Sequence, residues 1–115
     1  MNRTIRISMA AGLFLTALAP LPAHADKGAE RLWKAKCASC HGADGKGQTE
    51  QGQKLKVADY TTAAWQKAHT KEQIKKGIVD GVKDKKTGEE VMKGYADLGD
   101  KIDGLVDYVR GLAAK

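Results

Sequence analysis

The clearest alternation of apolar and polar positions lies near the C-terminus of the chain. Five apolar side chains recur there at the i, i+3, i+4, i+7 and i+10 positions: Ile102, Leu105, Val106, Val109 and Leu112. This spacing places them on one face of a helix, with charged residues on the other face. The pattern therefore predicts an amphipathic helix over residues 100–113.

A shorter helical pattern lies in the first third of the chain. Ala29, Leu32 and Trp33 fall at i, i+3 and i+4, and the basic residues Lys27, Arg31 and Lys34 lie at other positions. This arrangement predicts a short amphipathic helix over residues 26–36.

A third helix is predicted from its end signals. Thr70 and Gln73 have the spacing of a capping box, in which each side chain bonds the backbone of the other residue. Apolar residues at helical spacing follow, and Gly81 is a typical stop. The sequence predicts a helix over residues 70–80.

The remaining stretches are predicted as loops and one more short helix. Thr61 or Thr62 can cap a helix over residues 63–68. The glycine-rich stretch 42–52 and the lysine-rich stretch 82–96 are predicted loops. No strand pattern of convincing length and no internal repeat is present, so the domain is predicted to be all-α, with helices joined by long loops.

The first 25 residues have the pattern of a secretory leader. A basic start precedes an apolar run over residues 7–19, and small residues before Asp26 match a cleavage site. The apolar run is shorter than the roughly 20 residues that a membrane-spanning helix needs. We therefore predict a cleavable signal peptide over residues 1–25, export to the periplasm, and one domain over residues 26–115.

Composition and charge narrow the classes of partner and of fold. The formal net charge is +6, to which Arg3 and Arg6 of the leader contribute two charges. The bias of the mature domain is too mild, and too free of interleaved aromatic residues, for a nucleic-acid-binding protein. Aromatic residues make up only 5% of the chain, so a domain this small needs a staple or a cofactor to complete its core.

The most specific chemical motif is Cys37-Ala38-Ser39-Cys40-His41. A Cys-x-x-Cys-His sequence indicates covalent haem attachment. Two thiols three positions apart lie on one face of a helical turn and can add to two vinyl groups of one porphyrin. The imidazole of His41 can then supply a nitrogen ligand to the iron.

Other interpretations of these residues fit less well. A thioredoxin-like motif would follow a strand, and here a predicted helix precedes it. A zinc site needs four ligands, and Cys37, Cys40, His41 and His69 exhaust the candidates at a spacing unlike that of zinc fingers. The glycines at positions 42–52 lack the Lys-Ser/Thr ending of a phosphate-binding loop.

Two stretches resemble class I (monohaem) c-type cytochromes. They are residues 37–47, with the attachment motif, and residues 92–98, which are similar to the Met-Pro-x-Tyr run before the closing helix of that family. The resemblance implies a small fold of about four helices and long loops wrapped around one haem c. It also implies covalent attachment through Cys37 and Cys40, with His41 and Met92 as the axial iron ligands.

The resemblance further implies roles for residues around the haem. The opening helix would cross the closing helix at Gly28 or Ala29, with Trp33 below the crossing. Leu105 and Tyr108 lie where the closing helix meets it. A loop carbonyl would accept the second ring N–H of His41.

Aromatic and basic residues elsewhere could also serve a haem. Tyr60 and Trp65 could bond a propionate or simply belong to the core. Lysines around the haem edge could attract an acidic partner, and the candidates are Lys46, Lys75, Lys76, Lys83, Lys85, Lys86 and Lys93.

The function implied is that of a soluble electron carrier, not an enzyme. We expect a monomer that exchanges single electrons with a donor and an acceptor protein, with no nucleic-acid partner and no membrane span after leader removal. His69 is the rival sixth ligand, although its polar neighbours favour the surface. Lys93 stands where the family has proline, which keeps open a haem-based gas sensor, or a cytochrome subunit of a periplasmic oxidoreductase complex, with a labile sixth ligand.

Overall fold

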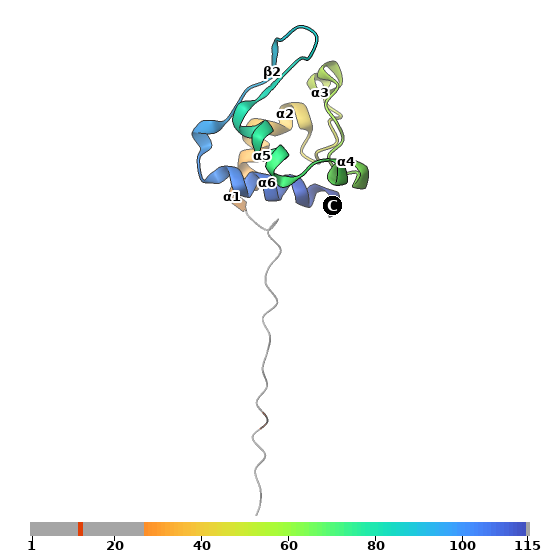
Figure 1. Ribbon diagram of the computed structural model, residues 1–115. Coiled ribbons are helices and arrows are strands. Elements are labelled where there is room, and N and C mark those ends of the chain that lie inside the picture. Colours follow the sequence, from red (N-terminus) through yellow and green to blue (C-terminus); the bar gives the residue numbers. More distant parts are fainter. Residues whose placement is uncertain (1–11, 13–26, 115) are drawn as a thin grey trace, which may run out of the picture.

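The computed structural model describes residue 12 and residues 27–114 (Figure 1). The predicted leader, apart from Gly12, lies outside the described residues. The helices are α1 (Lys27–Leu32), η2 (Trp33–Cys37), α2 (Ala38–His41), α3 (Glu50–Leu55), α4 (Ala63–Ala68), α5 (Lys71–Asp80), η3 (Ala96–Leu98), α6 (Lys101–Gly111) and η4 (Leu112–Ala114). The strands are β1 (Val82–Lys83) and β2 (Glu90–Met92). The all-α prediction is confirmed.

The opening helix is longer than the sequence pattern indicates. After α1 the chain continues through η2 and α2 without a break, so the attachment motif is itself helical. Within this run η2 is a π-helix, because the Ala38 N–H bonds the Trp33 carbonyl five positions earlier.

The closing helix α6 carries most of the core. It packs against both α1 and α5 (Figure 1). The buried apolar residues are Ala29, Trp33, Ile74, Ile102, Leu105, Val106, Tyr108, Val109 and Leu112. Each of the five positions predicted for the apolar face of this helix is buried, which confirms that prediction.

The capping signals of the middle helices are also confirmed. The Thr70 hydroxyl accepts a bond from Gln73 N at 3.2 Å, and the Gln73 side chain accepts one from Thr70 N at 2.9 Å. Gly81 ends α5 with a φ of +76°, a conformation that favours glycine. Of the two candidate caps for α4, Thr62 is the one that bonds the helix, accepting from Trp65 N.

The predicted loop over residues 42–52 is wrong at its end, because α3 begins at Glu50. Thr49 caps this helix by accepting a bond from Gly52 N at 2.8 Å, and its hydroxyl donates to the Cys40 carbonyl at 2.7 Å. A Cβ at Gly52 would collide with that same Cys40 carbonyl. The helix thus packs directly on the attachment motif.

The predicted loop over residues 82–96 contains a short antiparallel ribbon. Val82 pairs with Met92 and Lys83 with Glu90, with an irregularity between the two pairs. Asp84 stabilises the turn by accepting bonds from the backbone N–H groups of Lys86 and Thr87. The ribbon extends beyond the helices at the top of Figure 1.

Within the described part of the chain, no helix combines the length and the apolar character that crossing a membrane requires.

Candidate functional site

The four residues predicted to bind haem border one cavity. Cys37, Cys40, His41 and Met92 all line a hollow of about 350 Å³. An adjoining, mainly apolar hollow of about 250 Å³ shares three of them and extends to residues of α4, α5 and α6. Both hollows are lined by Lys36, Cys37, His41, Tyr60, Val82, Met92 and Tyr95. The fold therefore brings the attachment motif and the later methionine to one site.

His41 is the buried polar residue of this site. It ends α2, is 7% exposed, and its Nδ1 has no hydrogen-bond partner among the described residues. Burial lowers the pKa of the imidazole, which keeps the ring neutral at pH 7. A neutral imidazole has a lone pair that iron can bind.

The loop carbonyl that we expected to orient His41 does not bond its Nδ1. The carbonyl of Gly42, the next residue, accepts a bond from the indole Nε1 of Trp33 at 2.9 Å instead. His41 is held by packing, because its ring lies 5.7 Å from that of Trp33. Trp33 in turn lies 5.5 Å from the ring of Tyr108 on α6.

The small residue at the helix crossing is Ala29. It is buried, whereas Gly28 is exposed, and α1 packs against α6. The alternative between the two residues is therefore resolved in favour of Ala29.

The two cysteines are free thiols, each partly buried. Desolvation raises the pKa of Cys37 to about 11, even though the Lys36 ammonium opposes this shift. Neither sulfur is consumed by a disulfide, so both are available for thioether bonds.

Met92 ends the strand β2 and is partly buried at the cavity wall. Its strand partner Val82 lies directly after Gly81, which ends α5. The ribbon thus places the thioether beside the end of a helix.

Aromatic rings form another side of the cavity. The Tyr60 ring stacks on that of His41 at 4.9 Å and lies 4.1 Å from the ring of Trp65. Burial raises the pKa of Tyr60 to about 12. His69 stacks on Trp65 at 4.3 Å and also lines the cavity. The expectation that His69 belongs to the surface is therefore only half right, since the side chain is partly buried.

Sequence reasoning missed two residues that fix this aromatic wall. Arg110 donates bonds to the His69 carbonyl and to both oxygens of Gln66. The Gln66 amide donates to the Tyr60 carbonyl at 2.7 Å and to the Val109 carbonyl at 3.0 Å. Both residues are polar, and no local pattern distinguishes them from solvent-exposed positions.

Lysines border the cavity close to Cys40. They are Lys36, Lys56 and Lys93. Lys93 is the one shared with the candidates predicted from sequence, and another of those, Lys75, pairs with Asp103 at 2.9 Å. Apart from Lys93, the lysines at the cavity therefore differ from the set expected from the sequence.

The site fits a haem by its donor set and its apolar lining. Two unpaired thiols, a neutral imidazole and a thioether line the two adjoining hollows, and these groups could attach a haem and supply both axial ligands. Among residues 27–114, no group of three or more His, Cys, Asp or Glu side chains could hold a metal ion directly. A four-ligand zinc site is therefore not formed in that part of the chain.

Comparison with known proteins gives matches in sequence and in structure. The family model for cytochrome c matches residues 25–113. A solved structure titled KustC0563 c-type cytochrome is 28% identical, with a TM-score of 0.63 over 73% of this chain and 95% of that chain. A tyrosine-to-phenylalanine mutant of Kustc0563 matches similarly, at 28% identity and a TM-score of 0.62 over 73% of this chain and 96% of that chain. No curated protein matches in sequence.

Proposed function

Since the chain belongs to the cytochrome c family, we propose that it is a periplasmic carrier of single electrons with one haem c. The family binds haem covalently and transfers electrons, and its members are typically carriers rather than enzymes. The finer proposal concerns attachment through Cys37 and Cys40 and axial ligation by His41 and Met92.

The observation that carries this proposal is the common cavity. Met92 lies 51 positions after His41 in the sequence, yet both line the same hollow together with the two cysteines. A methionine in an ordinary surface loop would have no reason to line it.

Each of the four residues has a distinct task. Cys37 and Cys40 would form thioether bonds that keep the cofactor on the chain. His41 would donate a ring nitrogen and Met92 a sulfur to the iron. When bound, haem c supplies an iron that alternates between the ferric and ferrous states. A thioether ligand favours the ferrous state, so Met92 would raise the reduction potential relative to a second imidazole.

The partners we propose are an electron donor and an acceptor with acidic surfaces. Lys36, Lys56 and Lys93 surround the cavity on the side of Cys40, and opposite charges accelerate encounter between proteins. The association rate should therefore fall as ionic strength rises.

The first test is expression of the full chain with haem-attachment machinery. We expect a red protein whose mass exceeds that of the leader-free polypeptide by one haem, and whose ferric form shows the charge-transfer band of iron bound to a methionine sulfur. Met92→Ala should abolish that band, while Thr87→Ala at the tip of the ribbon should leave it intact. A colourless product, or a band that survives Met92→Ala, would contradict the proposal.

The same protein tests the gas-sensor alternative. The position of Lys93 in place of proline and the presence of His69 in the cavity wall favour examining it. A carrier with firm Met92 ligation should bind carbon monoxide slowly after reduction, whereas a sensor should bind it at once. His69→Ala should leave the methionine band unchanged if His69 is not a ligand.

A further inference from the structure

We propose that Gly81 and Gly94 are positioning residues for Met92, because they let the methionine segment lie directly against the end of α5. This inference rests on the proposed ligand role of Met92. It concerns how the chain holds that side chain in place without the proline that the family has after the methionine.

The segment after Met92 lies in backbone contact with the end of α5. The Tyr95 N–H donates to the Ile78 carbonyl at 2.7 Å. A Cβ at Gly94 would lie 2.5 Å from the Val79 carbonyl oxygen and 2.9 Å from the Asp80 carbonyl carbon. Real Cβ contacts are essentially never this short, so any larger residue at position 94 would force the two backbones apart.

The contact is just as close from the side of α5. A Cβ at Gly81 would collide with the Met92 carbonyl oxygen, and would lie 2.7 Å from Gly94 N and 2.9 Å from the Lys93 carbonyl carbon. Gly81 also has a φ of +76°, which strains any residue with a side chain. Gly81 and Gly94 therefore each lie against the backbone of the other's segment, where the end of α5 and the residues after β2 are in contact.

This contact restricts Met92 in a way that its own neighbours in sequence do not. Lys93 has the ordinary backbone freedom that a proline would remove. The pairing of Val82 with Met92 and the packing of the preceding residue, Gly81, against Met92 and Gly94 fix this segment at consecutive positions. The backbone carrying the thioether is thus held along its length by residues 81–82.

The chain provides a matched control. Gly88 has a φ of +74°, almost that of Gly81, but a Cβ there would meet nothing within 4 Å. Gly88→Ala thus reproduces the conformational strain of Gly81→Ala without the contact.

The experiment compares the three alanine variants as holoproteins. We expect Gly81→Ala and Gly94→Ala to lose most of the methionine-to-iron band and to bind carbon monoxide at least about tenfold faster after reduction, equivalent to about 1.4 kcal/mol. Gly88→Ala should behave like the parent. Equal behaviour of all three variants would overturn the proposal, whatever their thermal stability.

Two measurements on the parent protein keep the outcomes separate. If the parent protein lacks the methionine-to-iron band, the proposed ligation by Met92 is wrong. That result would not contradict the backbone contact at Gly81 and Gly94. If the glycine variants do not fold, amide exchange in the reduced parent decides: the Tyr95 N–H should be as protected as amides within α5. Exchange as fast as at Lys85, an exposed residue of the ribbon turn, would overturn the inference.

Discussion

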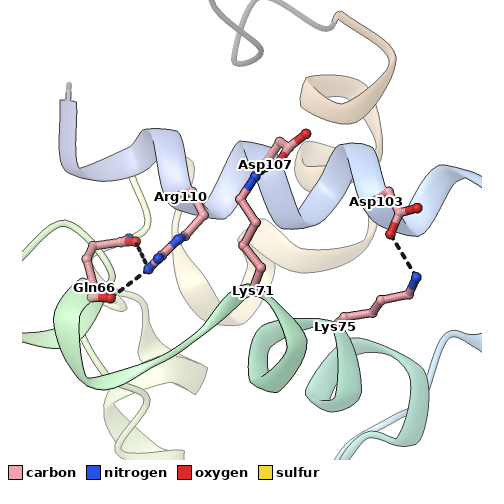
Figure 2. Close-up of polar contacts among 6 residues, drawn as sticks. All are labelled: Gln66, Lys71, Lys75, Asp103, Asp107 and Arg110. Atoms are coloured by element: carbon pink, nitrogen blue, oxygen red, sulfur yellow. Dashed lines mark hydrogen bonds and ion pairs between the residues drawn. The ribbon is translucent and has the colours of Figure 1, made fainter.

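Arg110 in α6 donates hydrogen bonds to both oxygens of Gln66, at 2.6 Å to the carbonyl and 3.1 Å to the side-chain Oε1 (Figure 2). A third bond reaches the His69 carbonyl at 2.9 Å. Because Gln66 also donates to the carbonyls of Tyr60 and Val109, this single pair fastens the aromatic wall of the cavity to the closing helix.

We expect Arg110→Lys to destabilise the holoprotein by about 1–3 kcal/mol. A lysine keeps the charge, but all three bonds are made by the terminal nitrogen Nη1 of Arg110, and the shorter lysine side chain, with its strongly hydrated ammonium, does not place a donor there. Urea denaturation followed by absorbance would measure the loss. Arg31→Lys, at an exposed position of α1, is the matched control and should change the free energy of unfolding by less than about 0.5 kcal/mol. An equal loss in both variants would refute the assigned role.

An exposed ion pair between α5 and α6 should contribute little to the free energy of unfolding. Lys75 and Asp103 approach to 2.9 Å, but their side chains are 52% and 73% exposed (Figure 2). Solvent screens such a pair, so a double-mutant cycle with Lys75→Ala and Asp103→Ala should give a coupling of less than about 1 kcal/mol. The coupling should shrink further in high salt. A larger coupling that is independent of salt would show that the pair is less solvated than its exposure indicates.

Leu112→Ala should be among the most damaging core substitutions. Its side chain is fully buried, and removing it leaves a cavity, which costs about 2–5 kcal/mol. Leu112→Met, which nearly preserves the volume, should cost less than about 1.5 kcal/mol. Thermal unfolding of the two variants would separate cavity formation from a general intolerance of change at this position.

The pKa of Tyr60 predicts an alkaline loss of stability. Burial raises it from the ordinary 10.0 to about 12, so the folded state disfavours the tyrosinate. The stabilisation is fully present below about pH 10 and is lost as the pH rises towards and through 12. Ultraviolet titration of tyrosinate should show a late step that Tyr60→Phe removes. A late step that persists in the variant would assign the high pKa to another tyrosine.

Features set by neighbours in sequence were predictable here. The caps of α4 and α5 depend on residues three positions apart, and the apolar face of α6 repeats within a few turns. For the same reason the attachment motif could be interpreted directly, since its three reactive residues are adjacent on one helical run.

The helix α3 and the ribbon escaped prediction for physical reasons. The α3 sequence is polar and contains Gly52, a poor helix former that is needed because it lies against the Cys40 carbonyl. The strands are two and three residues long, too short for alternation to be recognised. The bond between Arg110 and Gln66 spans 44 positions, and nothing local indicates it.

The π-helical turn at Trp33–Cys37 has a consequence for how the length of the chain can vary. An α-turn is closed by a bond to the carbonyl four positions earlier, whereas here the Ala38 N–H bonds the Trp33 carbonyl five positions earlier, so this turn holds one residue more. Deleting one residue from it would leave a regular α-turn, with Ala29 still facing the closing helix and both sulfurs where they are. A deletion elsewhere in the same helical run would instead rotate the preceding residues by about 100°. The distance in sequence from the start of the helix to the first cysteine can therefore shorten by one residue at this turn, whereas it is strictly constrained in the α-helical turns beside it.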